Sequence, residues 1–330
     1  MQYLMLGATG LKVSKIGLGT ASFGLERYGI PIPGEEPVDT VSAIKILRMA
    51  AEAGINLFDT APGYGRSEDL LGQGLASHKD CIIATKVPIP EGIAHIPYKE
   101  LERIVNGALD ASRRALRRDV LDIVQIHNAT IPMLREGKLL DCLEVARAAG
   151  KLKWIGASVY GPEAALAAIG TGRIQVLQLA VNLLDQRMCG RVLPEATRQG
   201  MGILTRSALL KGALTRRALW LPENLRPVAE ASASAVKRLE TTWQELPAVA
   251  LRFCLSLPAI QTVLVGVNRE SELRDSLAAE AAGALPEEAL EAAHSLALND
   301  EQLLNPSYWH LEESDLATHG PDSGIADALG

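Results

Sequence analysis

Eight short apolar segments, each followed by a longer segment with helical periodicity, constrain the fold of this chain most strongly. The segments are rich in valine and isoleucine, and they recur along most of the 330 residues. Such alternation predicts a parallel sheet, because each helix returns the chain to the start of the next strand. The eight predicted strands are residues 15–20, 55–60, 82–87, 121–127, 154–159, 176–181, 202–208 and 262–267.

Eight strand–helix units with no proline- or serine-rich linker favour one closed (β/α)8 TIM barrel over two domains. We expect a single domain over residues 1–330, with a β-hairpin plug at 1–14, the barrel at 15–298 and a C-terminal tail at 299–330. An open doubly wound sheet is the alternative, because residues 17–24, GLGTASFG, form a glycine-rich loop after the first strand. Their spacing differs from G-x-G-x-x-G, which favours the barrel.

Local signals mark two boundaries within this plan. Gly54 directly precedes the second predicted strand, where a glycine commonly follows the end of a helix. After residue 298 the helical periodicity is lost, and Tyr308 and Trp309 are predicted to anchor the tail on the body of the protein.

The composition limits the classes of partner. With 48% hydrophobic and 22% charged residues, the chain has the balance of a globular protein. A net charge of −6 gives no basic surface for nucleic acid or for an anionic membrane. No apolar run approaches the roughly 20 residues of a membrane span, and the first residues lack a secretion pattern. We expect a cytoplasmic protein that acts on a small molecule, and we predict a monomer.

Cysteine and histidine spacing argues against a metal centre. The four cysteines, Cys81, Cys142, Cys189 and Cys254, form no C-x-x-C pair, so neither a disulfide framework nor a metal site is predicted. Five of the six histidines are scattered through predicted helices, loops and the tail. A barrel hydrolase or metal enzyme would need paired carboxylates or clustered ligands at the strand ends, and the sequence shows neither.

Four polar residues lie at or just after consecutive strand ends. Asp59 lies at the end of the second predicted strand, Lys86 at the end of the third and His127 at the end of the fourth, each within one residue of the last position, while Tyr64 lies in the loop after the second. In a barrel of this kind the carboxyl ends of the strands carry the functional groups. Taken singly, each residue has a structural explanation as a cap, a rim charge or a packed ring. Their occurrence together at one mouth predicts a catalytic site.

The chemistry of these groups suggests acid–base work. A phenol ordinarily has a pKa of about 10, too high for ready proton exchange at neutral pH. We expect the Lys86 ammonium to lower the pKa of Tyr64, with Asp59 holding the lysine charged and in place. His127 would then orient a carbonyl oxygen toward Tyr64, leaving the carbonyl carbon open to a hydride from a nicotinamide.

The chain resembles the aldo-keto reductase superfamily over nearly its whole length. The resemblance is carried by GINLFDTAPGYGRSEDLLGQGL, by ATKV and by LDIVQIHN. It implies a catalytic tetrad of Asp59, Tyr64, Lys86 and His127, with Tyr64 as the proton donor in carbonyl reduction. It also implies that NADP(H) or NAD(H) lies across the barrel mouth. The cofactor-binding residues implied are Gly19, Thr20, Ser158, Gln178, Arg206, Gly266, Asn268, Arg269 and Glu272.

Particular roles follow from the same resemblance. Ser158 and Gln178 would hold the nicotinamide carboxamide, although Val159 stands where many members have asparagine. Arg206 lies near the position from which many members stack an aromatic ring on the nicotinamide, so a guanidinium plane would replace that ring. Alternatively, Arg206 is a solvated charge at the end of a strand.

The segment VGVNRESELRDS resembles the loop and helix start that bind the adenosine phosphates. Backbone amides around Gly266 would face an anion at a helix N-terminus. Members that prefer NADPH usually carry arginine where this chain has Asn268, so Arg269 is the adjacent cation for a 2′-phosphate. Glu272 aligns with a position that often contacts the adenine.

Three functions are consistent with the sequence. GLGTASFGLERYGI, SVYGPEAAL and NLLDQR resemble a bacterial branch associated with sugar and polysaccharide biosynthesis, which suggests a sugar-like carbonyl or alcohol. The first function is reduction of an aldehyde or ketone by NAD(P)H, and the second is an NAD-dependent dehydrogenase that works in the oxidative direction. The third is a cofactor-sensing binding module in which turnover is not the main role.

Overall fold

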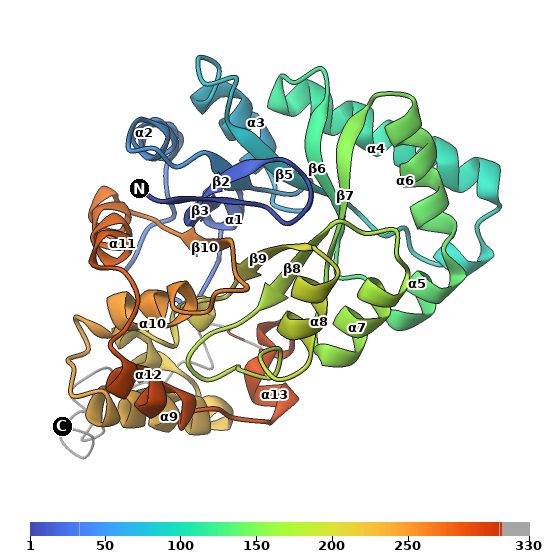
Figure 1. Cartoon of the computed structure of the whole chain (residues 1–330). Helices are drawn as coiled ribbons and strands as arrows, with labels where there is room; N and C mark the ends of the chain where they lie inside the picture. Colours follow the sequence, from blue (N-terminus) through green and yellow to red (C-terminus); the bar gives the residue numbers. More distant parts are fainter. Residues whose placement is uncertain (33, 310, 312–330) are drawn as a thin grey trace.

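Eight parallel strands close into a barrel in the computed structural model, which describes residues 1–32, 34–309 and 311 (Figure 1). Around the barrel the strands follow the order β10-β3-β4-β5-β6-β7-β8-β9, and β10 pairs with β3 to complete the ring. The strands are β3 Ile16–Gly19, β4 Leu57–Asp59, β5 Ile82–Val87, β6 Leu121–Ile126, β7 Leu152–Ser158, β8 Val176–Ala180, β9 Gly202–Arg206 and β10 Thr262–Gly266. The predicted (β/α)8 barrel is confirmed, and the doubly wound sheet is wrong.

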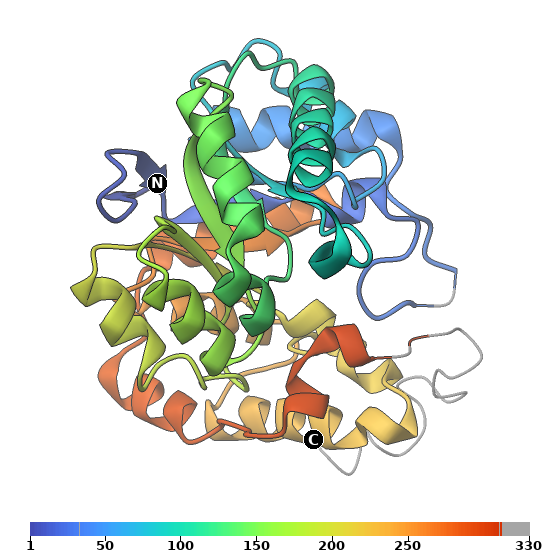
Figure 2. The same ribbon diagram turned by 90° about the vertical axis from the view of Figure 1, so that its right-hand side faces the viewer.

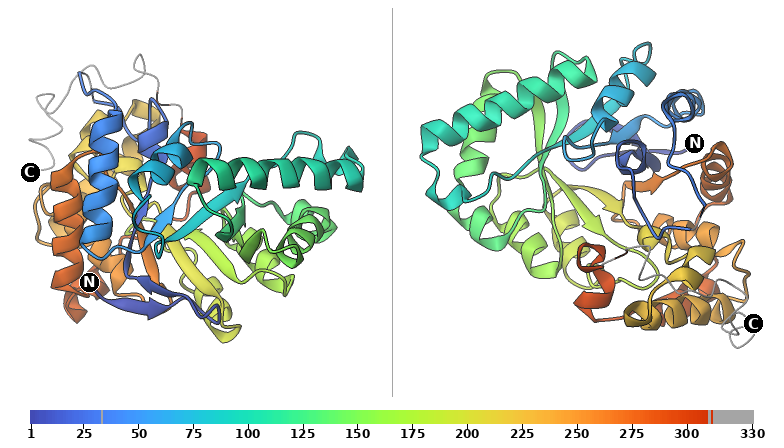
Figure 3. Two further views of the ribbon diagram at one scale, coloured as in Figure 1. Left: turned by 90° about the horizontal axis from the view of Figure 1, so that it is seen from above. Right: turned by 180° about the vertical axis from the view of Figure 1, so that it is seen from behind.

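Helices surround the barrel and connect successive strands (Figure 3). Their apolar sides, together with the outward side chains of the strands, form one continuous core. The α-helices are α1 Ala21–Gly24, α2 Thr40–Glu52, α3 Ser67–Gly74, α4 Tyr98–Leu116, α5 Ile131–Glu136, α6 Lys138–Ala148, α7 Pro162–Gly170, α8 Val192–Arg198, α9 Arg226–Arg238, α10 Leu246–Leu255, α11 Glu270–Ala282, α12 Glu287–His294 and α13 Glu301–Leu304. Short 3-10 turns are η1 Ile93–His95, η2 Leu210–Gly212, η3 Arg216–Trp220, η4 Glu223–Leu225 and η5 Pro306–Tyr308.

Gly54 ends the segment of α2 as the sequence predicts. The helix stops at Glu52, and Gly54 follows with a φ of 94°. This left-handed conformation is one that glycine adopts without steric penalty. The chain therefore turns sharply there and enters β4.

An antiparallel hairpin plugs one end of the barrel, as the sequence predicts. It consists of β1 Tyr3–Met5 and β2 Lys12–Ser14, with Leu4 opposite Val13. Leu6 and Val13 are fully buried against inward side chains from several barrel strands. Figure 2 shows the hairpin on one side of the barrel and the loop between α1 and α2 (blue) on the other. The hairpin thus covers the amino ends of the strands and leaves their carboxyl ends open.

The segment after residue 298 is more regular than the sequence predicts, since α13 and η5 both lie in it. Trp309 is buried and its indole donates a hydrogen bond to the Leu303 carbonyl at 3.1 Å, which matches the predicted anchor. Tyr308 is 44% exposed, so its predicted role as an anchor is wrong. The rest of the predicted tail, residue 310 and residues 312–330, lies outside the described residues.

The pleat of the strands explains which side chains enter the barrel. Side chains alternate between the two faces of a strand. Leu57 of β4 and Ile82 and Ala84 of β5 point inward, since they pack with the hairpin residues inside the barrel. Two residues further along each strand, the same face carries Asp59 and Lys86. The period of two therefore directs both side chains into the barrel at its carboxyl end.

Candidate active site

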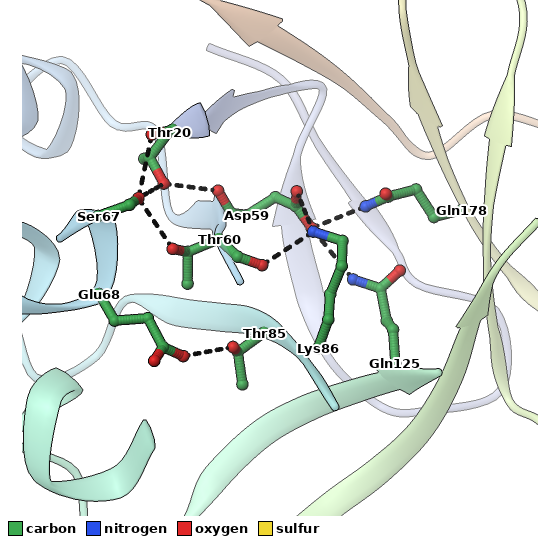
Figure 4. A network of polar contacts seen from close by, with 9 residues as sticks. All are labelled: Thr20, Asp59, Thr60, Ser67, Glu68, Thr85, Lys86, Gln125 and Gln178. Carbon is green, nitrogen blue, oxygen red and sulfur yellow. Dashed lines mark hydrogen bonds and ion pairs between the residues drawn. The ribbon is translucent and has the colours of Figure 1, made fainter. Parts of the chain in front are cut away.

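A buried ion pair between Asp59 and Lys86 lies at the centre of the site (Figure 4). Lys86 Nζ is 2.7 Å from Asp59 Oδ2 and donates a second hydrogen bond to the Thr60 carbonyl at 2.8 Å. Both side chains are almost fully buried. Burial lowers the pKa of Lys86, and the Asp59 carboxylate opposes that change. The Asp59 carboxylate therefore favours the charged form of Lys86 in an interior that disfavours an ammonium group.

Two glutamine side chains complete the hydrogen bonding of Asp59. Gln125 Nε2 of β6 and Gln178 Nε2 of β8 both donate to Asp59 Oδ1, at 3.0 and 2.7 Å. Gln125 was not predicted from the sequence, although it lies on the inward face of β6, two residues before His127. The side-chain oxygen of Gln125 is buried without a hydrogen-bond partner among the described residues. Gln178 was predicted to contact the carboxamide of the cofactor. In the structure its amide nitrogen donates to Asp59 instead.

Hydroxyl groups fix the loop that carries Tyr64. The Thr20 hydroxyl donates to the Asp59 carbonyl at 2.9 Å, and the Ser67 hydroxyl donates to the Thr20 carbonyl at 3.0 Å. Ser67 also bonds the Thr60 hydroxyl at 2.9 Å. Thr20 and Gly19 both line the cavity, but the Thr20 side chain is fully buried. Thr20 therefore joins the start of α3 to the end of β4 from behind the site.

Backbone contacts hold Tyr64 in a tight turn. Its amide donates to the Ala61 carbonyl at 3.0 Å, and its carbonyl accepts from the Ser67 amide at 3.1 Å. Gly24 of α1 packs directly on this turn, since a Cβ built there would lie 1.7 Å from the Tyr64 carbonyl oxygen. The Tyr64 ring faces Lys86, whose Nζ is 4.8 Å from the ring centroid. It meets the His127 ring edge-on, with 5.7 Å between centroids.

The phenol of Tyr64 is a weaker acid than the sequence predicts. Burial and the Asp59 carboxylate raise its pKa above the usual value, and the Arg206 charge opposes them. The expectation of a lowered pKa is wrong, because the charge of Lys86 is balanced by Asp59 at 2.7 Å. Tyr64 is accordingly protonated at neutral pH.

His127 is neutral at the same pH. Burial, and then the nearby charge of Lys86, lower the pKa of its imidazole to about 4. A neutral imidazole carries one N–H donor and one acceptor nitrogen. With Tyr64 beside it, the site therefore presents two neutral hydrogen-bond donors toward the same open space.

A cavity of about 900 Å³ lies at the carboxyl ends of the strands and contains Tyr64 and His127 in its wall. Its volume is in the range of sites for large organic ligands. Of the residues predicted to bind a cofactor, the wall includes Gly19, Thr20, Ser158, Gln178, Arg206, Gly266, Asn268, Arg269 and Glu272. The structure thus brings all nine predicted cofactor residues to one cavity together with Asp59, Tyr64 and His127. Lys86 lies behind the wall, where its side chain is fully buried.

Arg206, at the end of β9, lies between the tetrad and an aromatic residue. Its guanidinium carbon is 3.9 Å from the centroid of the Tyr160 ring, and Nη2 donates to the Val159 carbonyl at 3.2 Å. One face of the guanidinium plane is therefore covered by Tyr160. Its Nε is buried with no hydrogen-bond partner among the described residues. The interpretation as a solvated rim charge is wrong, because the side chain is half-buried and stacked.

The predicted phosphate-binding segment forms another part of the cavity wall. Gly266 ends β10 with its backbone exposed, and a Cβ built there would meet the Tyr28 ring at 4.0 Å, an ordinary van der Waals contact. The Asn268 amide donates to Glu272 Oε2 at 2.6 Å, and Arg269 Nη2 lies 2.9 Å from Glu35 Oε1. Glu35 was not predicted from the sequence to belong to the site. Exposed backbone beside the first turn of α11 fits a dinucleotide. So does Arg206 Nε on the same cavity, which has no hydrogen-bond partner in the part of the chain that the structure describes.

Two negative findings concern the described part of the chain. No helix in it combines the length and apolarity that crossing a membrane requires. No group of three or more histidine, cysteine, aspartate or glutamate side chains within it has an arrangement that could hold a metal ion.

Comparisons with known proteins agree with this arrangement. The model of the aldo/keto reductase family matches residues 15–297. L-galactose dehydrogenase of Arabidopsis thaliana is 30% identical over 299 residues, covering 83% of this chain and 86% of that protein. The NADH-specific methylglyoxal reductase of Escherichia coli is 26% identical over 311 residues, covering 84% and 93%. The holo form of an aldo-keto reductase from Bacillus halodurans has a TM-score of 0.72 at 24% identity, covering 90% and 97%.

The family match spans most of the chain, including every strand of the barrel. The solved structure supports the same fold over nearly its whole length. The site geometry and the sequence matches thus lead to one assignment: the chain belongs to the aldo/keto reductase family and is an NAD(P)-dependent enzyme.

Proposed function

We propose that this enzyme reduces the aldehyde or ketone group of a sugar-like substrate, with Tyr64 as the proton donor. One observation carries the proposal: the protonated Tyr64 phenol lies on the cavity between neutral His127 and the buried Lys86. These are the groups needed to bind a carbonyl oxygen and then deliver a proton to it. A bound nicotinamide supplies the hydride that the carbonyl carbon receives.

Tyr64 acts as the acid in this scheme. Its raised pKa keeps the proton on the phenol until negative charge develops on the substrate oxygen. As the proton leaves, the Lys86 ammonium, which lies over the Tyr64 ring at 4.8 Å from its centroid, favours the phenolate that remains. Asp59 acts one step away, as a positioning residue that holds Lys86 charged and fixed.

His127 orients the carbonyl. Because its pKa is about 4, the imidazole is neutral and donates a single N–H without competing for the proton of Tyr64. Two donors from different strands define the position of one oxygen atom. The carbonyl carbon is thereby directed toward the part of the cavity lined by Ser158, Gln178 and Arg206.

The nicotinamide dinucleotide is proposed to lie along this cavity from Arg206 to Gly266. Ser158 and Gln178 would contact the carboxamide, although Gln178 shares its amide nitrogen with Asp59. The exposed face of Arg206 opposite Tyr160 would stack on the ring. Gly19, Gly266 and the amides that precede α11 would receive the phosphates.

A sugar-like substrate fits the remaining wall. Tyr28, Asn128, Tyr160 and Trp220 surround the cavity and combine flat apolar surfaces with hydrogen-bonding groups. Aromatic faces and polar edges suit a polyhydroxylated ring or chain. The similarity to L-galactose dehydrogenase supports the same class of substrate.

The pH dependence of both reaction directions tests the role of Tyr64. Reduction needs the phenol, so its kcat is expected to stay constant from pH 6 to pH 9. Oxidation of the alcohol needs the phenolate, so its rate should rise roughly tenfold per pH unit over that interval. Galactose and related aldoses, with methylglyoxal as a small carbonyl, are suitable test compounds. A reduction rate that falls with a midpoint near pH 7 would refute Tyr64 as the donor. Cofactor binding without turnover of any carbonyl or alcohol would instead favour the binding module.

A further inference from the structure

We infer that Glu35 makes this cavity select NADH over NADPH. The inference rests on the proposed function, in which the cavity holds a nicotinamide dinucleotide with its adenosine end near Asn268. It concerns the group that distinguishes the two nucleotides, the 2′-phosphate of NADPH, which is a hydroxyl in NADH.

Glu35 connects three loops at the open end of the barrel. It lies in the loop between α1 and α2, and both of its oxygens bind Arg217 of η3, at 2.6 and 2.7 Å. Glu35 Oε1 also accepts from Arg269 Nη2 at 2.9 Å. All three side chains line the cavity, and the Glu35 side chain is only 17% exposed. A single carboxylate therefore binds cations from the loops after β9 and β10.

This arrangement removes the cation that a 2′-phosphate would need. Asn268 is uncharged, and Arg269 is the adjacent positive residue. Because Arg269 is paired with Glu35, a phosphate at this position would have to displace a carboxylate that is itself held by Arg217.

Glu272 adds to the same discrimination. Its carboxylate accepts from the Asn268 amide at 2.6 Å, so this backbone donor is already occupied by an anion. A ribose 2′-hydroxyl can donate to a carboxylate, whereas a phosphate oxygen cannot. Other nucleotide-binding folds use the same chemistry, with an acidic residue for NAD and an arginine for NADP.

The test compares Glu35→Gln with a matched control, Glu36→Gln. Both variants lose one carboxylate from the same loop, but Glu36 is exposed to solvent. Dissociation constants for NADH and NADPH are measured by fluorescence titration, and far-UV circular dichroism checks that each variant is folded. The wild type is expected to bind NADH more tightly than NADPH by at least about tenfold. Glu35→Gln should shift the ratio of the two constants toward NADPH by about tenfold, and Glu36→Gln should leave it unchanged.

A second variant tests whether Arg269 is the released cation. Arg269→Gln is expected to change NADPH binding little on its own, and to cancel the gain when combined with Glu35→Gln. Arg216 is a second exposed cation on the cavity wall, so Arg216→Gln should leave the Glu35→Gln gain intact. If Arg216→Gln cancels the gain and Arg269→Gln does not, the assignment of Arg269 is wrong.

The remaining outcomes distinguish failure of the inference about Glu35 from failure of the proposed function. Tighter binding of NADPH than of NADH by the wild type would overturn the inference and leave the proposed function intact. Equal effects of Glu35→Gln and Glu36→Gln on the ratio would do the same. Failure of the folded wild type to bind either nucleotide would overturn the proposed function and the inference with it.

Discussion

Replacing Asp59 by asparagine removes the charge that balances the buried ammonium of Lys86. The change preserves the size of the side chain but leaves a lysine with 2% exposure facing a neutral amide. Breaking a buried ion pair at one partner typically destabilises a protein by about 3–5 kcal/mol. Asparagine also offers one oxygen where the aspartate accepts from Lys86, Gln125 and Gln178 together. We therefore expect the free energy of unfolding to fall by about 3–5 kcal/mol.

Guanidinium denaturation, followed by tryptophan fluorescence and circular dichroism, measures this effect. The double variant with Asp59→Asn and Lys86→Met removes both charges, so it should recover most of the lost stability. Asp119→Asn serves as the matched control, because Asp119 is exposed and its loss should change stability by less than about 0.5 kcal/mol. A loss below about 1 kcal/mol for Asp59→Asn would refute the reasoning. So would a double variant that is as unstable as the single one.

Two further predictions concern the residues around Tyr64. Because burial and the charge of Lys86 lower the pKa of His127 to about 4, NMR titration should show a neutral imidazole down to about pH 5. A midpoint near 6.5 would contradict the buried environment. Gly24→Ala places a methyl group 1.7 Å from the Tyr64 carbonyl oxygen, so the turn must shift and kcat should fall at least about tenfold. Gly107→Ala, where nothing lies within 4 Å, should leave kcat unchanged; equal losses would argue against a role of the turn.

The barrel could be predicted because its information is periodic and local. Valine- and isoleucine-rich segments alternate with helical ones, and Gly54 marks one of the boundaries. The pleat then fixes the inward faces, which is why Asp59 and Lys86 could be expected at the barrel mouth. The same alternation identifies Gln125, and it was overlooked because an amide within an apolar strand does not suggest chemistry.

Other features of the site depend on contacts that the periodicity of the sequence does not predict. Arg206 stacks on Tyr160, which follows a different strand. Glu35 meets Arg217, which is 182 residues away along the chain, in a cluster formed by loops and the 3-10 turn η3. Loop paths are set by packing against the finished barrel, so their side-chain partners could not be read from spacing.

The sign of the Tyr64 pKa shift was also beyond the sequence. A free ammonium near a phenol lowers its pKa, but the ammonium of Lys86 is balanced by Asp59. Burial then becomes the largest influence and raises the pKa instead. Which effect is greater depends on a distance of 2.7 Å that only the fold defines.

Single-turnover reduction by the wild type and by Tyr64→Phe tests the central claim most directly. The enzyme is loaded with NADH and mixed with an aldehyde, and the loss of reduced nicotinamide is followed with time. We predict that Tyr64→Phe binds NADH as tightly as the wild type but reduces the aldehyde more slowly by a factor of about 10²–10⁴. Equal rates in the two proteins would show that another group provides the proton, and would contradict the assignment of Tyr64.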